Sequence, residues 1–169
     1  MSVESGKISV RDKAIRLPHP DARLLDLLPG ASFADSYRWR YSSEPLEAPL
    51  WLDRVLGKPP KWVGRLMILR NHIATRLGLT EASLDGFPVL HSSPDRIVVG
   101  MDDWHLDFRI MCLCDLAADG TQLVTMGTVV RPHNLAGRAY LAAVMPFHRL
   151  ISNTLIARAS APPDVYRAP

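Results

Sequence analysis

Hydrophobic and polar residues alternate with a period of two between residues 33 and 41. Tyr37, Trp39 and Tyr41 alternate there with serine and arginine residues. A period of two places the aromatic rings on one face, which predicts a half-buried strand. Before it, the leucine-rich stretch at residues 21–28 is followed by Pro-Gly, which predicts a short helix or turn.

The period lengthens to three or four between residues 45 and 79, which predicts two consecutive helices. The first surrounds Trp51, and the second begins at Lys61, after the turn sequence GKPP. Apolar residues recur in the second helix at helical spacing, and Gly78 is placed to end it. Its opposite side carries arginine and lysine residues, which we interpret as a solvated basic face rather than a site for an acidic partner.

The period returns to two after residue 87. Four strands are predicted, over residues 87–92, 96–102, 104–115 and 121–131. The short Ser-Pro-Asp and Ala-Asp-Gly connections favour antiparallel neighbours. Asn134 can cap a final helix from Leu135 to about residue 159. The order of elements predicts a single α+β domain over residues 15–161, with a flexible lead-in at 1–14 and a tail at 162–169.

Composition narrows the class of protein. Of 169 residues, 47% are apolar and 22% charged, which is typical of a globular domain and excludes disorder. The net charge is only +3 and the basic residues are scattered, so no nucleic-acid partner is expected. No apolar run reaches the roughly 18 residues of a membrane helix, and no secretory signal is visible. With only Cys112 and Cys114, which we interpret as buried apolar side chains, a cytoplasmic protein without membrane partner is expected.

The strand predicted from residue 104 carries three ionisable residues on one face, His105, Asp107 and Arg109. If that face lines a cavity, Asp107 could act as a base, Arg109 could hold an oxyanion and His105 could move a proton. If the face points outward, the same residues form weak surface ion pairs. Alternation favours the outward orientation, because the other face of the strand is apolar and belongs on the core.

The final helix offers a second set of candidates. Its apolar stripe includes Tyr140 and Phe147, and His148 lies beside it. Pro146 should bend or open the helix, which leaves room for a cavity below it. His148 could bond the freed carbonyl or face a ligand, and Arg138 in the first turn could hold an anion or be a plain surface residue. The histidines lack the spacing of zinc ligands, so no metal is expected.

Three sequence strings carry a resemblance to a known family. They are PKWVGRLMILRN at residues 60–71, DDWHLDFR at 102–109, and HNLAGRAY at 133–140 followed by VMPFHR at 144–149. They are similar to an uncharacterised bacterial family, DUF family 2867, over about residues 15–160. The element order also resembles the helix-grip architecture of the START and birch-allergen (SRPBCC) superfamily. That resemblance implies a curved antiparallel sheet wrapped around a long C-terminal helix and a ligand cavity, with two helices inserted after the first strand.

The family supplies no activity to transfer. Similar domains occur fused to short-chain-dehydrogenase-like domains, but this chain has no Gly-x-Gly-x-x-Gly segment, so no dinucleotide or other cofactor is expected. The favoured hypothesis is a binding module for a small apolar or amphipathic molecule. Its predicted ligand-binding residues are Tyr37, Trp39, Phe108, Arg138, Tyr140, Val144, Phe147, His148 and Ile151.

Two other classes of function stay open at this stage. One is a cofactor-independent cyclase, isomerase or lyase that uses Asp107, Arg109 and a histidine, with His105 and His148 as the candidates. The other is an interaction or regulatory protein with a filled core. The helix-grip scaffold hosts both binding proteins and enzymes, so fold alone does not choose between them. The sequence also leaves a homodimer open.

Overall fold

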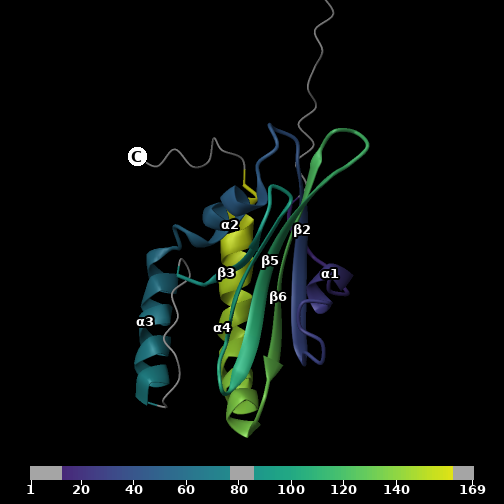
Figure 1. The fold of residues 1–169 in the computed structure, drawn as a ribbon. Coiled ribbons are helices and arrows are strands. Elements are labelled where there is room, and N and C mark those ends of the chain that lie inside the picture. Colours follow the sequence, from purple (N-terminus) through teal and green to yellow (C-terminus); the bar gives the residue numbers. More distant parts are fainter. Residues whose placement is uncertain (1–12, 77–85, 162–169) are drawn as a thin grey trace, which may run out of the picture.

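The computed structural model describes residues 13–76 and 86–161 as an α+β fold (Figure 1). Its elements in chain order are β1 (Ile15–Arg16), α1 (Ala22–Leu25), β2 (Phe33–Tyr41), α2 (Ala48–Leu56), α3 (Lys61–Arg76), β3 (Val89–Ser92), β4 (Arg96–Asp102), β5 (Leu106–Leu116), β6 (Gln122–Pro132) and α4 (Leu135–Ala159). No helix within these two ranges is both long enough and apolar enough to cross a membrane.

One antiparallel sheet of six strands organises the fold, in the order β1-β2-β6-β5-β4-β3. The predicted meander of β3 to β6 is confirmed, and β2 pairs with β6 along its whole length, from Phe33 opposite Val130 to Tyr41 opposite Gln122. β1, which the sequence did not indicate, pairs with β2 only at two residues. Most of the outer edge of β2 therefore has no strand beside it among the described residues.

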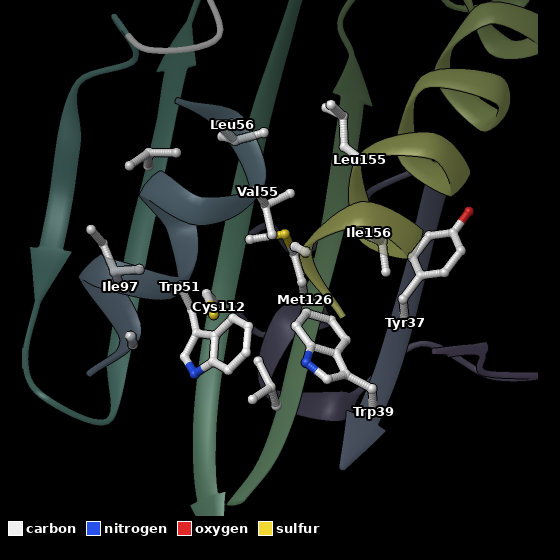
Figure 2. Packing of buried hydrophobic residues seen from close by; sticks show 14 residues of the cluster. Tyr37, Trp39, Trp51, Val55, Leu56, Ile97, Cys112, Met126, Leu155 and Ile156 are labelled. Carbon is white, nitrogen blue, oxygen red and sulfur yellow. The ribbon is translucent and has the colours of Figure 1, made fainter. Parts of the chain in front are cut away.

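Helices cover both faces of the sheet. Figure 1 shows α2 and α4 on one face and α1 on the other, while α3 stands beyond α4, away from the sheet. We call these faces the helix side and the α1 side. The helix-side core is built around Trp39 and Trp51, whose rings meet edge to face at 5.5 Å (Figure 2). On the α1 side, Leu24 and Leu28 pack on Met111 of β5.

Local signals placed β2 and the start of α4 correctly. β2 spans residues 33–41 as predicted, and α4 begins after Asn134, whose side chain accepts a hydrogen bond from the Gly137 amide at 3.0 Å. Gly120 turns the β5–β6 hairpin with φ of 77°, a conformation that glycine adopts without strain. α4 continues as one helix through Pro146.

Two strand starts differ from the sequence prediction by two residues, and β6 begins one residue later than predicted. β5 begins at Leu106 rather than residue 104, because the Asp103 amide donates to the Leu106 carbonyl and closes a tight turn there. His105 therefore belongs to a turn. β3 begins at Val89, two residues later than predicted. The helix stop expected at Gly78 lies outside the described residues, as do most of the predicted lead-in and tail, so the proposed domain limits stay a prediction.

Candidate functional site

A polar cluster lies between β2 and α4, within the apolar layer on the helix side of the sheet. β2 directs Phe33, Asp35 and Tyr37 toward α4, since alternate residues of a strand share a face. α4 contributes His148 and Ser152, which lie one helical turn apart on the same side. We call Asp35, Tyr37, His148 and Ser152 the helix-side polar cluster.

The imidazole of His148 stands at the centre of this cluster. Its Nε2 atom lies 3.3 and 3.5 Å from the two carboxylate oxygens of Asp35, and 3.4 Å from the hydroxyl of Ser152. The ring of Phe33 meets the imidazole edge-on, with 5.4 Å between centroids. The Asp35 side chain is 1% exposed and that of His148 is 21% exposed. A molecule that approaches from outside would therefore meet the imidazole before the carboxylate.

Tyr37 adds a hydrogen-bond donor to the cluster. Its hydroxyl is buried beside the carboxylate of Asp35, which attracts its proton only weakly, and it makes no hydrogen bond of ordinary length within residues 13–76 and 86–161. Figure 2 shows the ring beside α4, with the hydroxyl pointing away from Trp39. Burial, together with the neighbouring carboxylate of Asp35, raises the pKa of Tyr37. The hydroxyl therefore keeps its proton at neutral pH and can donate it to a hydrogen bond.

The cluster cannot work as a Ser-His-Asp relay. In such a relay the serine and the aspartate use opposite nitrogens of the histidine ring, whereas Ser152 and Asp35 both contact Nε2 of His148. The arrangement instead combines a buried carboxylate, an imidazole that can take up a proton, and an unengaged hydroxyl donor. These groups can anchor a polar atom of a ligand or move a proton.

Sequence reasoning named Tyr37 and His148 but missed Asp35 and Ser152. Asp35 did leave a signal, because it is a charged residue at an aromatic position of the alternation in residues 33–41. Its partner His148 is 113 residues away, and that contact depends on how α4 crosses the sheet. Nothing in the neighbourhood of Ser152 distinguishes it from an ordinary helix residue.

The predicted ligand-binding residues divide between the interior and the surface. Tyr37 and Trp39 are buried in the helix-side core, where Ile151 packs against them. Phe147 is 51% exposed and Arg138 is exposed. Half-buried positions are occupied by Val144, Phe108, whose ring contacts Phe87, and Tyr140, whose hydroxyl accepts a hydrogen bond from Arg70. The structure brings Tyr37, Trp39, Ile151 and His148 into one layer, and their role in ligand binding stays a prediction.

Asp107 and Arg109 lie on the α1 side, as alternation favoured, and do not converge with His148. The Asp107 carboxylate accepts a hydrogen bond from Arg131 at 2.8 Å and lies 2.8 Å from Nε2 of His133. Burial alone would raise the pKa of Asp107, but these two hydrogen bonds outweigh it and lower the pKa. Arg109 pairs with the exposed carboxylate of Asp102 at 2.6 Å. Both residues therefore join neighbouring strands.

His105 is separated from Asp107 and Arg109 because it precedes β5. Its ring is 2% exposed and packs edge-on against Tyr140 of α4, with 5.3 Å between centroids. Nδ1 lies 3.5 Å from a carboxylate oxygen of Asp103, and neither ring nitrogen has a hydrogen-bond partner among the described residues. The three ionisable residues predicted to share a strand face thus occupy two different environments.

An apolar cleft of about 170 Å³ lies between α2 and the strands β3 and β4. Its walls are formed by Pro49, Leu52, Asp53, Leu56, Gly57, Phe87, Val89 and Val99. None of the predicted ligand-binding residues belongs to these walls. Ligand pockets usually measure about 300–1,000 Å³, so this cleft suits only a small fragment.

The cysteines and metal-ligating residues offer no further site within the two described ranges. Cys112 is buried, and a hydrogen bond with Cys114 together with burial raises the pKa of its thiol. A thiol with a raised pKa is a poor nucleophile at neutral pH. No group of three or more His, Cys, Asp or Glu side chains in residues 13–76 and 86–161 is arranged to hold a metal ion.

Comparison with known proteins assigns the chain to a family. A family model described as "Protein of unknown function (DUF2867)" matches residues 27–155. Among solved structures, the chain is similar to CalU16 from Micromonospora echinospora at 12% identity, over 88% of this chain and 92% of that one, with a TM-score of 0.34. A likeness at this level does not establish a shared fold. A search of curated proteins finds no match. Because the family model spans more than half of the sequence, this protein belongs to the DUF2867 family, whose function is unknown.

Proposed function

We propose that this protein binds a small, mainly apolar molecule between the sheet and α4, in the manner of a helix-grip domain. The observation that carries the proposal is the Tyr37 hydroxyl, which is buried beside the carboxylate of Asp35 without a hydrogen bond of ordinary length. A buried polar group left without a hydrogen bond costs about 1–3 kcal/mol of stability. A polar atom of a bound molecule would remove this cost, while the surrounding aromatic rings would receive its apolar part.

The other two hypotheses have less support. The acid–base residue set of Asp107, Arg109 and His148 is divided between the two sides of the sheet. An interaction protein with a filled core gives no reason for an unengaged hydroxyl next to a buried carboxylate. Buried polar groups of a purely structural core are nearly always hydrogen-bonded.

Titration with 2-naphthol tests the proposal, because this probe combines an apolar ring system with one hydroxyl. We expect saturable binding to the full chain, followed by NMR chemical shifts of Tyr37 and His148. Tyr37→Phe should weaken binding about tenfold, which corresponds to about 1.4 kcal/mol. Its melting temperature should stay equal or rise, since the variant removes an unsatisfied polar atom.

The matched control is Tyr41→Phe, which makes the same change on the same face of β2, beside Trp51. This control should bind 2-naphthol as the wild type does. Native mass spectrometry of the purified protein gives a second readout, because a co-purifying apolar molecule should be lost from Tyr37→Phe alone. Equal affinity of the wild type and Tyr37→Phe would contradict the proposal, as would the absence of both saturable binding and a co-purifying molecule.

A further inference from the structure

We propose that His148 is a general base that removes a proton from carbon in the bound molecule, with Asp35 as its positioning residue and Tyr37 as the hydrogen-bond donor to the oxygen that gains negative charge. The inference rests on the proposed function and names its substrate class. The substrate is a small, mainly apolar carbon acid, whose acidic C–H bond is conjugated to an oxygen that can accept the electron pair.

The position of Asp35 favours the tautomer of the His148 ring that proton removal by Nδ1 requires. A carboxylate 3.3 Å from Nε2 favours the tautomer in which Nε2 carries the hydrogen. The lone pair then lies on Nδ1, which has no hydrogen-bond partner in the described part of the chain. When Nδ1 takes up a proton, the positive ring stands beside a carboxylate that is 1% exposed, where attraction between charges is stronger than in water.

The fold gives this pair no evident structural task. Burying the carboxylate of an aspartate in an apolar layer, with a histidine as its ion-pair partner, lowers the stability of the fold through desolvation. Apolar residues of similar size can often replace buried ion pairs without loss of stability. Asp35 has no arginine or lysine partner among the described residues, unlike Asp21 and Asp107 on the α1 side.

The imidazole of the cluster is partly exposed near the edge of the sheet. β1 pairs with β2 at Tyr37 and Arg38, and the Leu17 amide continues this contact to the Ser36 carbonyl. Within the described residues, no strand pairs with this edge of β2 at Phe33. The His148 side chain retains 21% exposure. We therefore expect a ligand to make its first contact with the exposed part of the imidazole.

The proton and electron balance of the step is complete without a cofactor. Nδ1 of His148 takes the proton from carbon, and the electron pair of the broken C–H bond moves into the conjugated system to the oxygen. The Tyr37 hydroxyl donates a hydrogen bond to that oxygen and remains protonated. In an isomerisation, the imidazolium returns the proton to another carbon, and no oxidant or reductant takes part.

The elimination of 5-nitrobenzisoxazole tests this chemistry directly, because a base removes its single acidic C–H proton and the N–O bond breaks to give a coloured phenolate. The full-length protein should accelerate the reaction above a buffer of equal imidazole and carboxylate content, and 2-naphthol should inhibit it competitively. His148→Gln should lower kcat/KM by about 100-fold or more, within the range for general-base catalysis. Tyr37→Phe should lower it about tenfold, because it loses one donor to the developing phenolate.

Asp35→Asn separates positioning from structure. It should lower kcat by tenfold or more while KM stays near the wild-type value. The nitrogen chemical shifts of the His148 ring should also change from the Nε2–H tautomer toward a mixture, which a merely structural role would not produce. His91→Gln, at an exposed histidine of β3, is the matched control and should retain the full rate.

The outcomes distinguish this inference from the proposed function. A rate no higher than the buffer rate, or an equal rate in His148→Gln, overturns the inference. If 2-naphthol still binds and Tyr37→Phe still weakens that binding, the protein is a binding module without base catalysis. If binding fails as well, both proposals fall together.

Discussion

The two sides of the sheet treat their polar side chains in opposite ways. On the α1 side, the carboxylate of Asp21 accepts hydrogen bonds from Arg23 and Arg38, at distances of 3.0 and 2.9 Å. Asp107 is likewise held by Arg131 and His133. On the helix side, Asp35 faces a single histidine, and the hydroxyl of Tyr37 and the indole nitrogen of Trp39 lack partners among the described residues.

This difference indicates which polar groups stabilise the fold and which do not. Carboxylates on the α1 side connect neighbouring strands, or connect a strand to the chain before α1. Each of them forms an ion pair with an arginine side chain. Those interactions make the α1 side a structural layer. On the α1 side, Nε of Arg131 is also buried without a partner among the described residues, but that guanidinium is held by Asp107. The helix side leaves donors of two side chains, Tyr37 and Trp39, without partners among the described residues, which costs stability and requires another explanation. The proposed ligand site supplies that explanation.

The largest expected effect comes from the same substitution made on each side. Asp107→Asn should lower the free energy of unfolding by about 2 kcal/mol, because the negative charge beside Arg131 is lost and one of the two acceptor oxygens becomes a donor. Asp35→Asn should cost less than about 1 kcal/mol, since the variant also removes the desolvation cost of a buried charge that has no arginine or lysine beside it among the described residues. Urea unfolding followed by circular dichroism measures both values. Equal costs would remove the distinction between a structural side and a functional side.

Much of the fold was predictable because its strongest signals are local. The aromatic alternation fixed β2, and Asn134 fixed the start of α4 through its own side chain. β1 escaped prediction because two residues carry no periodicity, and it exists only through its pairing with β2. The start of β5 was wrong because the turn closed by Asp103 depends on a backbone bond that residue types do not indicate.

Only two of the four residues of the helix-side polar cluster were predicted, because the contacts between β2 and α4 are not local in sequence. The phase of β2 indicated which residues share a face, so Tyr37 was placed on the inner side and Asp35 could have been. Which residues of α4 lie above them depends on the crossing of helix and sheet, a tertiary property. Alternation in β5 favoured an outward orientation for Asp107 and Arg109, and they do lie on the side away from α4. The sequence did not indicate that α1 and its flanking loops cover this face, which leaves Asp107 buried rather than solvated.

A second, smaller effect should distinguish the two sides by pH. The lowered pKa of Asp107 means that the folded protein holds its carboxylate charged where the unfolded chain would take up a proton. Stability from this group is present above pH of about 4 and is lost as the pH falls further. The raised pKa of Tyr37 affects stability at alkaline pH. Its contribution is present below pH of about 10 and is lost as the pH rises further.

The measurement is the free energy of unfolding across both pH limits, in wild type and variants. Asp107→Asn should flatten the acid limb and leave the alkaline limb unchanged. Tyr37→Phe should do the reverse. An alkaline limb that is equally steep in the wild type and in Tyr37→Phe would show that the helix side does not bury an ionisable hydroxyl at Tyr37.

The smallest effect on the free energy of unfolding is expected at Arg109, which lies on the α1 side of the sheet. Its partner Asp102 is 66% exposed, and ion pairs at the surface contribute little. Arg109→Gln should therefore cost about 0.5 kcal/mol in urea unfolding. It should leave 2-naphthol binding unchanged, because the sheet stands between Arg109 and the helix-side polar cluster. A loss of binding as large as that of Tyr37→Phe would place the ligand on the α1 side. Asp107 would then be the residue with a functional charge, and Asp35 would have to be explained by packing alone.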